Sequence, residues 1–485
     1  MNDHQPGDFH ATPADPDADP DAGTADLLRR TAELAIEYRA GLAGGPVAPR
    51  TTATALQAAF GGPLPEQGTP AGAIIEDLAR EIPPGLMAMP GPRFFGFVIG
   101  GGLPAAVAAD WLTSAWDQNA AAAILSPAAA AIEAVAAEWL VDLFGLPGGS
   151  SVGFTTGATM ANFTALAAAR DAVLRRVGWD VEADGLHGGP RVSVVIGEDA
   201  HVTVFAGLRM LGFGERAPLR VAADGEGRVR LDALRATLGR VSGPTIVCLQ
   251  AGNVNSGSFD PLAAAIAIVR EVCPDAWVHI DGAFGLWAAA VPSLRHRMAG
   301  HAGADSWSTD AHKWLNVPYD CGLVFVRDAA AHRAAMGMSA SYLPFNTVAE
   351  RDPGDFGPDL SRRARGFPVY AALRSLGRSG VVDLVERCCG LARRFADALV
   401  VDPGTEVLNE VVLNQGLVRF DDSDARTRDV VRRLQEDGTA WFGGGTWHGR
   451  AVMRISVINW WTREHDVDWS VDAIRRCLAS SRRDA

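Results

Sequence analysis

Lysine is nearly absent from this sequence of 485 residues. One of its 44 basic residues is lysine, Lys313, and the other 43 are arginine. A composition bias toward arginine explains the arginines, but it does not explain where the single lysine stands. Arginine keeps its proton at any pH that a protein meets, whereas lysine can lose its proton and attack a carbonyl carbon. We therefore expect a chemical role for Lys313; the alternative is a chance survivor of the bias.

Other absences limit the class of protein. Basic residues form no block and the net charge is -13, which argues against nucleic acid or an anionic membrane as the main partner. No apolar run approaches the length of a membrane span, and the first 24 residues lack the basic start and apolar run of a secretory signal. The six cysteines form no C-x-x-C pair and indicate free thiols in a reducing compartment. The sequence predicts a cytoplasmic protein.

Several catalytic motifs are also missing. The chain has no Walker phosphate loop, no G-x-S-x-G elbow around a nucleophilic serine, and no set of His, Cys and carboxylate residues at zinc spacing. We therefore expect no metal site, no nucleotide binding by a Walker loop and no hydrolysis by a nucleophilic serine.

The hydrophobic pattern predicts four regions. Residues 1–24 are acidic and rich in Pro and Asp, which is typical of a disordered tail. Residues 25–90 form an N-terminal helical segment with helices expected over 25–42 and 71–81. Residues 91–368 alternate strand and helix patterns, which predicts a large α/β domain with a mostly parallel sheet. Residues 369–485 predict a small α+β domain. The expected strands of the large domain are 192–196, 245–250, 277–280 and 322–326.

Two segments place polar groups where an α/β sheet binds ligands. VHIDGAFG brings Asp281 to the end of an expected strand, and open α/β sheets bind ligands at the carboxyl ends of strands. The alternative for Asp281 is a helix cap or a turn former. GFTTGATMANFTAL opens a helix with small and hydroxyl residues, so its free N–H groups can bind an anion. The alternative there is an ordinary N-cap.

Together with Lys313 these features fit the chemistry of pyridoxal phosphate. A lysine forms a Schiff base with the aldehyde, and an acid keeps the pyridine nitrogen protonated so that the ring withdraws electrons. The helix N-terminus would hold the phosphate. His201, which follows another expected strand, can lie flat on the ring, although a lone histidine is more often structural.

The sequence resembles the group II pyridoxal-phosphate-dependent amino-acid decarboxylases, the family that includes aromatic-L-amino-acid decarboxylase, from about Phe94 to Ile474. DAHKWLNVPYDCG resembles the segment of the Schiff-base lysine, VHIDGAFG that of the pyridinium-binding acid, EDAHVTVFAG that of the stacking histidine, and TGATMAN the phosphate loop. The cofactor-binding residues that the resemblance implies are Gly157, Ala158, Thr159, His201, Asp281, Ala283, His312 and Lys313.

The resemblance also implies a proton donor. SYLPF matches a mobile loop of the family whose tyrosine protonates the carbanion after CO2 leaves, and it places Tyr342 in that role. Relatives with phenylalanine there tend to make aldehydes by oxidative deamination, so the tyrosine favours plain decarboxylation. The catalytic residues that we expect are Lys313, His201, Tyr342 and Asp281.

The substrate-side segments match the family least well. Val98 and Ile99 stand where aromatic-acid decarboxylases usually have Pro and Thr, and Asn119 stands where they carry a bulkier apolar group. Phe97 and Trp116 nevertheless indicate an apolar pocket, so we expect an apolar or aromatic L-amino acid. The substrate-binding residues that we expect are Phe97, Val98, Ile99 and Asn119.

The resemblance implies a fold-type I pyridoxal-phosphate enzyme that works as a homodimer, with active sites at the interface. Two other reactions would use the same cofactor residues, namely oxidative decarboxylation–deamination to an aldehyde and carbon–carbon lysis. An inactive cofactor-binding scaffold is a further reading of the sequence.

Overall fold

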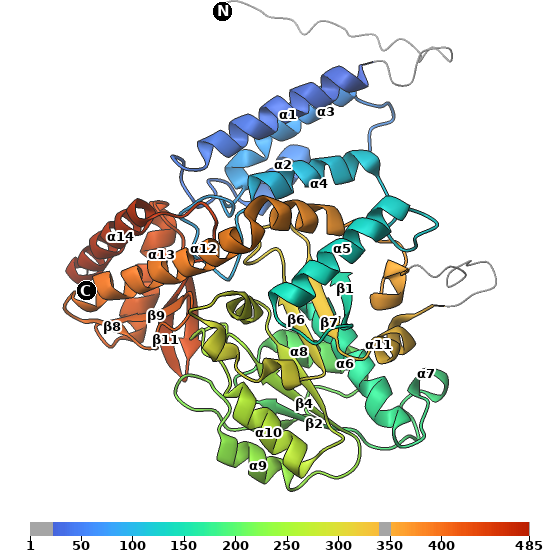
Figure 1. Ribbon diagram of the computed structural model, residues 1–485. Coiled ribbons are helices and arrows are strands. Elements are labelled where there is room, and N and C mark those ends of the chain that lie inside the picture. The colour runs from blue at the N-terminus through green and yellow to red at the C-terminus, as the bar shows by residue number, and fades with distance from the viewer. Residues whose placement is uncertain (1–22, 339–350, 485) are drawn as a thin grey trace, which may run out of the picture. The chain divides into compact units, whose positions relative to one another are not determined.

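The computed structural model describes residues 23–338 and 351–484 (Figure 1). The chain divides into two compact units, one up to Ala88 and the other from Met89. The first unit contains α1 (Thr24–Gly41), α2 (Ala53–Phe60), α3 (Ala71–Glu81) and the short 3-10 helix η1 (Pro83–Gly85). The expected helices over 25–42 and 71–81 are confirmed as α1 and α3. The sequence analysis missed α2, which has only eight residues and begins where the Thr52 hydroxyl accepts the Ala55 N–H.

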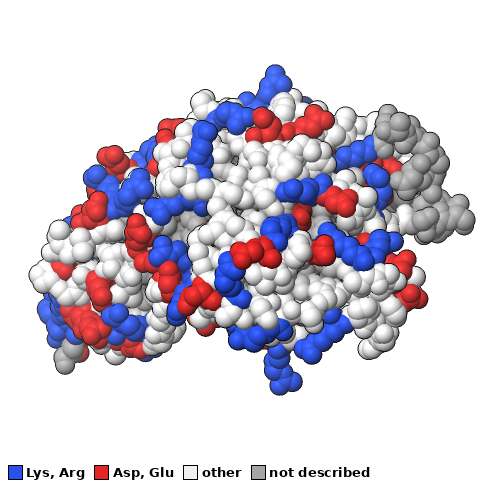
Figure 2. Space-filling view, turned by 60° about the horizontal axis from the view of Figure 1, so that its bottom comes forward, with Lys and Arg blue, Asp and Glu red and all other residues white. Residues whose placement is uncertain are grey.

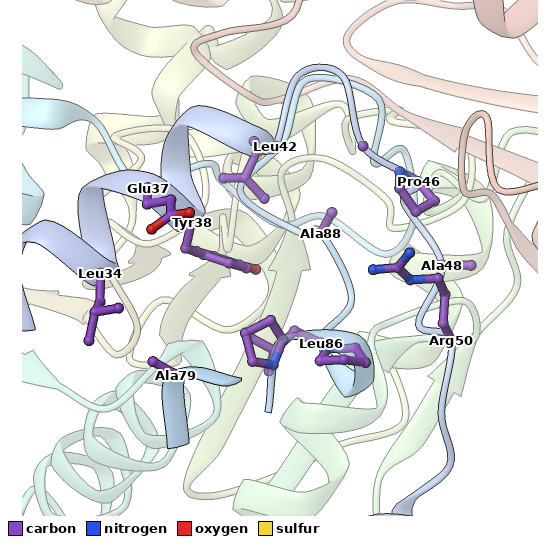
Figure 3. A pocket seen from close by; sticks show the side chains of 14 residues that line it. Leu34, Glu37, Tyr38, Leu42, Pro46, Ala48, Arg50, Ala79, Leu86 and Ala88 are labelled. Carbon is purple, nitrogen blue, oxygen red and sulfur yellow. The ribbon is translucent and has the colours of Figure 1, made fainter. Parts of the chain in front are cut away.

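A pocket of about 350 Å³ lies within this first unit (Figure 3). Helix α1, the loop after it and the residues around Pro83 form its walls, and the Tyr38 and Arg50 side chains reach toward it from opposite sides. Burial raises the pKa of the Tyr38 phenol above its ordinary value. The pocket contains none of the site residues expected from the sequence.

The second unit is built on a sheet of seven strands in the order β1-β7-β6-β5-β4-β2-β3. Strand β7 runs antiparallel to β1 and β6, and every other pair is parallel, so the mostly parallel α/β sheet is confirmed. The strands are β1 (Ser151–Thr155), β2 (Ser193–Gly197), β3 (Leu219–Val221), β4 (Thr245–Gln250), β5 (Trp277–Asp281), β6 (Ser306–Asp310) and β7 (Gly322–Val326). The sequence analysis missed β1, β3 and β6, whose residues do not form an apolar run of typical length.

Both faces of this sheet are covered, because successive strand residues point to opposite sides. Val194 and Ile196 of β2 belong to a core with α6, α8 and α11, whereas Val195 between them belongs to the larger core on the other face. The helices of the large domain are α4 (Pro104–Trp116), α5 (Pro127–Leu143), α6 (Ala158–Arg175), α7 (Val181–Asp184), α8 (Val202–Met210), α9 (Leu231–Leu238), α10 (Leu262–Val272) and α11 (Ala329–Met336).

The C-terminal part confirms the expected α+β arrangement. Its antiparallel sheet has the order β10-β11-β9-β8, with β8 (Thr405–Val407), β9 (Gln415–Phe420), β10 (Gly443–Trp447) and β11 (Arg450–Ser456), beside the helices α13 (Asp424–Asp437) and α14 (Glu464–Arg483). The sequence predicts two helices over 369–376 and 381–399. The structure joins them into α12 (Gly366–Val400), which is kinked where Gly377 has φ 60° and ψ 179°.

Charges of both signs are interspersed on the surface. On the face shown in Figure 2, the coloured residues form no continuous basic area. Many arginines there and elsewhere are paired with acids, as in the contact of Arg394 with Asp468 at 2.8 Å. Within residues 23–338 and 351–484, no helix has both the length and the apolar character needed to cross a bilayer.

Candidate active site

Lys313 lies in the turn between β6 and β7, at the carboxyl end of the parallel strands. Its Nζ is 2.8 Å from the Oδ2 of Asp310 and 6.0 Å from the centre of the Phe284 ring. The side chain is 18% exposed, and the next residues, Trp314 and Leu315, are buried in the core. The amine is therefore held in place beside a carboxylate but can still be reached from outside.

Asp281 is the last residue of β5 and is 4% exposed. Its Oδ1 accepts the Ala283 N–H at 3.1 Å, while its buried Oδ2 has no hydrogen-bond partner among the described residues. A buried polar atom without a partner costs about 1–3 kcal/mol, so this oxygen calls for a donor from a ligand. The protonated ring nitrogen of pyridoxal phosphate is such a donor, and Asp281 fits that group.

The expected phosphate loop is the N-terminus of α6. The Ala158 N–H donates to the Asp310 Oδ1 at 2.6 Å, so an anionic oxygen already lies at this helix end. Gly157 is packed against β7 so closely that a Cβ atom on Gly322 would lie 2.4 Å from the Gly157 carbonyl carbon. Thr159 is half-buried in the first turn of the helix. The N–H groups, the helix dipole and the absence of side-chain bulk suit a phosphate.

His201 caps the N-terminus of α8, and its Nδ1 lies 2.8 Å from the Thr203 hydroxyl. Burial lowers the pKa of His201; Asp281 opposes this effect, and Lys313 adds to it. The structure therefore brings His201 into one electrostatic cluster with Asp281 and Lys313.

Burial likewise lowers the pKa of His312, which stacks on Tyr319 with ring centres 4.4 Å apart and accepts the Cys321 N–H through Nδ1.

Arg454 of β11 lies near the expected site residues, and the sequence analysis did not select it. Its guanidinium also lowers the pKa of His201, which places it in the same cluster. One terminal nitrogen donates to the Val254 carbonyl at 2.5 Å, and the buried Nε has no partner in the part of the chain described here. The available signal was a lone charge inside the apolar run of residues 451–458.

The expected substrate segment runs directly past Lys313. The Gly100 N–H donates to the His312 carbonyl at 3.2 Å. Phe97 is 59% exposed and stacks on Trp441 with ring centres 5.6 Å apart, whereas Val98 is buried in the main core. Ile99, which follows Val98, is half-buried.

The remaining expected residues have different surroundings. Asn119 is exposed, and its Oδ1 accepts the backbone N–H groups of Ala121 and Arg362 at 3.2 and 3.3 Å. Tyr342 lies outside the described residues. Over the ranges 23–338 and 351–484, no group of three or more His, Cys, Asp or Glu side chains could hold a metal ion.

The chain is similar in sequence and in fold to several known proteins. Residues 55–421 match the pyridoxal-dependent decarboxylase conserved domain. The chain is 28% identical over 488 residues to tryptophan decarboxylase 1 of Oryza sativa subsp. japonica, covering 93% of this chain and 92% of that protein. It is 29% identical to the L-2,4-diaminobutyrate decarboxylase of Rhizobium meliloti, covering 82% and 80%. Among solved structures, Oryza sativa TDC with PLP and tryptamine has the same fold, with a TM-score of 0.87, 24% identity and 97% and 99% coverage.

Proposed function

The chain belongs to the pyridoxal-dependent decarboxylase family, and from this premise we propose that it converts an apolar or aromatic L-amino acid into its amine and CO2. It is a carboxy-lyase that uses pyridoxal phosphate. The observation that carries the proposal is that Lys313, the only lysine, and Asp281, whose buried Oδ2 has no partner among the described residues, both act electrostatically on His201.

Each proposed cofactor residue has a physical task. When bound, pyridoxal phosphate supplies an aldehyde for an amine and a ring that withdraws electrons from the bond to be broken. Lys313 would supply the amine, and the Asp310 carboxylate at 2.8 Å holds its Nζ in place. Asp281 holds the proton on the ring nitrogen through Oδ2.

The loop before α6 and the residues around the ring complete the cofactor site. Gly157 and Thr159 offer backbone N–H groups to the phosphate, Ala158 keeps the loop free of side-chain bulk, and His312 lies beside this loop. His201, whose pKa is lowered by burial, would cover one face of the ring. Ala283 would lie against the other face.

Arg454 is proposed to bind the α-carboxylate of the substrate. Arg454 is half-buried, its buried Nε lacks a partner among the described residues, and it lies in the same cluster as His201. A guanidinium fork fixes the orientation of a carboxylate, and the breaking bond must stand perpendicular to the ring. Excluding water around that carboxylate favours the loss of neutral CO2.

The substrate side chain and the final protonation involve other residues. Phe97, Val98, Ile99 and Asn119 are proposed for the substrate side, where Phe97 offers an exposed aromatic ring. Tyr342 is proposed to protonate the α-carbon. The alternative, oxidative deamination to an aldehyde, uses the same cofactor residues and differs in what happens at that carbon.

Product analysis tests this function. Purified protein with pyridoxal phosphate is incubated with the twenty amino acids, dopa, ornithine and 2,4-diaminobutyrate, and CO2, amine, ammonia and peroxide are recorded together. Equal amounts of CO2 and amine from an apolar or aromatic substrate are expected. CO2 with ammonia and peroxide would favour the oxidative alternative, and turnover of the diamino acids alone would contradict the apolar substrate class. Bound cofactor without any turnover would support the scaffold reading.

We also propose a cytoplasmic homodimer. Helix α4 and the turn after it expose large apolar side chains that a second copy could cover, namely Trp111, Leu112, Trp116, Ile124 and Leu125. All six cysteines are free, as in proteins of a reducing compartment.

A further inference from the structure

The sheet face beneath α6 carries a row of buried polar side chains. His279 and Asp281 point to the same face because residues alternate along β5. Strand β6 pairs in register with β5, so Ser306 stands opposite His279 and Ser308 opposite Asp281. Asn162 reaches the row from the second turn of α6, and all except Asp281 have 0% exposure. Four polar groups are thus buried directly behind the acid of the site.

At the end of the row away from Asp281, the donor and the acceptor of each hydrogen bond can be assigned. The Trp277 indole N–H donates to the Ser306 hydroxyl at 2.8 Å, and that hydroxyl lies 2.9 Å from the His279 Nδ1. Burial lowers the pKa of His279 to about 4, so its ring is neutral near pH 7. The His279 Nε2 lies 2.9 Å from the Asn162 Oδ1, which can only accept. His279 therefore carries its proton on Nε2 and accepts the Ser306 hydroxyl hydrogen on Nδ1.

Ser308 connects the row to the acid. Its hydroxyl donates its one hydrogen to the Asn162 Oδ1 at 2.5 Å, and the Ser308 oxygen packs 3.5 Å from the Asp281 Oδ1. The Ala283 N–H, which donates to this Oδ1 at 3.1 Å, and the Ser308 side chain packed beside it place Oδ1 on the inner side of the carboxylate. The second oxygen, Oδ2, is left for a ligand.

Packing alone does not explain why these buried positions carry polar side chains. Apolar side chains of similar size would fill the space under α6 at equal or better stability, because a buried polar network that is incompletely satisfied costs free energy. The network is incomplete, since the buried Asn162 Nδ2 has no partner among the described residues. What the polar groups provide, and apolar groups would not, is a fixed direction for the Asp281 carboxylate.

We propose that Asn162, His279 and Ser308 are positioning residues that hold the Asp281 carboxylate so that its Oδ2 keeps the cofactor ring nitrogen protonated. This inference rests on the proposed function of Asp281. None of the three needs to touch the cofactor, and each acts through the next: His279 orients Asn162, Asn162 orients Ser308, and Ser308 confines the carboxylate.

The test reads the ring nitrogen directly. The holoenzyme is loaded with pyridoxal phosphate labelled with ¹⁵N in the ring, and the chemical shift of that nitrogen is measured at pH 7.5 for the unchanged protein and for Ser308→Ala. We expect a protonated nitrogen in the unchanged protein and a shift toward the neutral pyridine value in the variant. Ser308→Thr keeps the hydroxyl and should restore the original shift. Ser470→Ala removes another fully buried serine hydroxyl, in α14, and should change nothing.

Kinetics of the same variants give a second readout. Ser308→Ala should lower kcat about 10-fold with little change in KM, as for other groups that orient a catalytic residue. If Ser308 variants fold poorly, Asn162→Ala tests the same link by the same shift. A ring nitrogen that stays fully protonated in both alanine variants would overturn the positioning network but leave the role of Asp281 intact. A neutral nitrogen in the unchanged protein would overturn both.

Discussion

At the scale of single residues, the site depends on charges that are buried close together. Asp310 contacts both the Lys313 amine and the first N–H of α6, so one carboxylate links the two ends of the proposed cofactor site. Asp281 and Arg454 each keep one buried polar atom without a partner among residues 23–338 and 351–484. Buried charges are costly unless they are paired, which is why such residues mark places where a ligand completes the pairing.

The first prediction concerns Arg454. Arg454→Gln should raise KM for the amino acid about 10- to 100-fold, because a hydrogen bond between charged groups contributes about 1.5–3 kcal/mol. Cofactor affinity should stay within about twofold, since Arg454 is proposed to bind the substrate and not the cofactor. Arg450→Gln, a half-buried position at the start of the same strand, is the matched control. Steady-state kinetics would refute the assignment if both variants kept the original KM.

Single residues were predictable where their chemistry was unusual in the sequence. Lys313 stood out because it is the only lysine, and Asp281 because it ends an apolar strand before a glycine. Arg454 was not selected, because it is one of 43 arginines and only the fold brings β11 near His201. Contacts between residues that are far apart in sequence need the tertiary structure.

At the scale of elements, β6 explains why part of the sheet escaped sequence analysis. Its residues SWSTD alternate polar groups toward α6, with Ser306, Ser308 and Asp310 on one face. Strands of parallel sheets are usually recognised by continuous apolar runs, and this strand departs from that pattern because one of its faces carries the buried polar groups of the proposed site. The merged helix α12 escaped for another reason: Gly377 resembles a break but only kinks the helix.

The second prediction concerns the contact between β7 and the loop before α6. Gly322→Ala places a methyl group 2.4–2.7 Å from three backbone atoms of Gly157, so one of the two segments must move. We expect the affinity for pyridoxal phosphate to fall at least about 10-fold, because the phosphate N–H groups are displaced. Gly390→Ala in α12 meets no atom within 4 Å and should leave affinity unchanged. Cofactor titration by absorbance checks both, and equal affinities would contradict the close-packing argument.

At the scale of the whole molecule, alternation of strands and helices was enough to predict the α/β class and the small C-terminal α+β part. The strand order β1-β7-β6-β5-β4-β2-β3 was not predictable, because it depends on which strands pair and not on their individual patterns. Burial of this large sheet also encloses ionisable groups that would be charged in water. His332 is fully buried, with its Nδ1 2.8 Å from the Ser151 hydroxyl.

The third prediction is that the free energy of unfolding decreases as the pH falls below about 6.5. Burial and the nearby Arg351 lower the pKa of His332 to about 3, and burial lowers that of His279 to about 4. The unfolded chain binds these protons near pH 6.5, so stability is full above that pH and falls as the pH drops toward 4. Each histidine should lower the free energy of unfolding by about 1.4 kcal/mol per pH unit in that window. His332→Gln should flatten the slope by this amount in denaturant titrations, and an unchanged slope would contradict it.

The central claim is that Lys313 carries the cofactor, and the composition of the chain makes it unusually direct to test. Protein loaded with pyridoxal phosphate is reduced with borohydride, and peptide mass spectrometry locates the attached cofactor. We expect one attachment, on the peptide that contains Lys313, and none after Lys313→Ala, because the chain has no other lysine side chain. Full amino-acid turnover by Lys313→Ala, or no attachment to Lys313 in the loaded unchanged protein, would contradict the account.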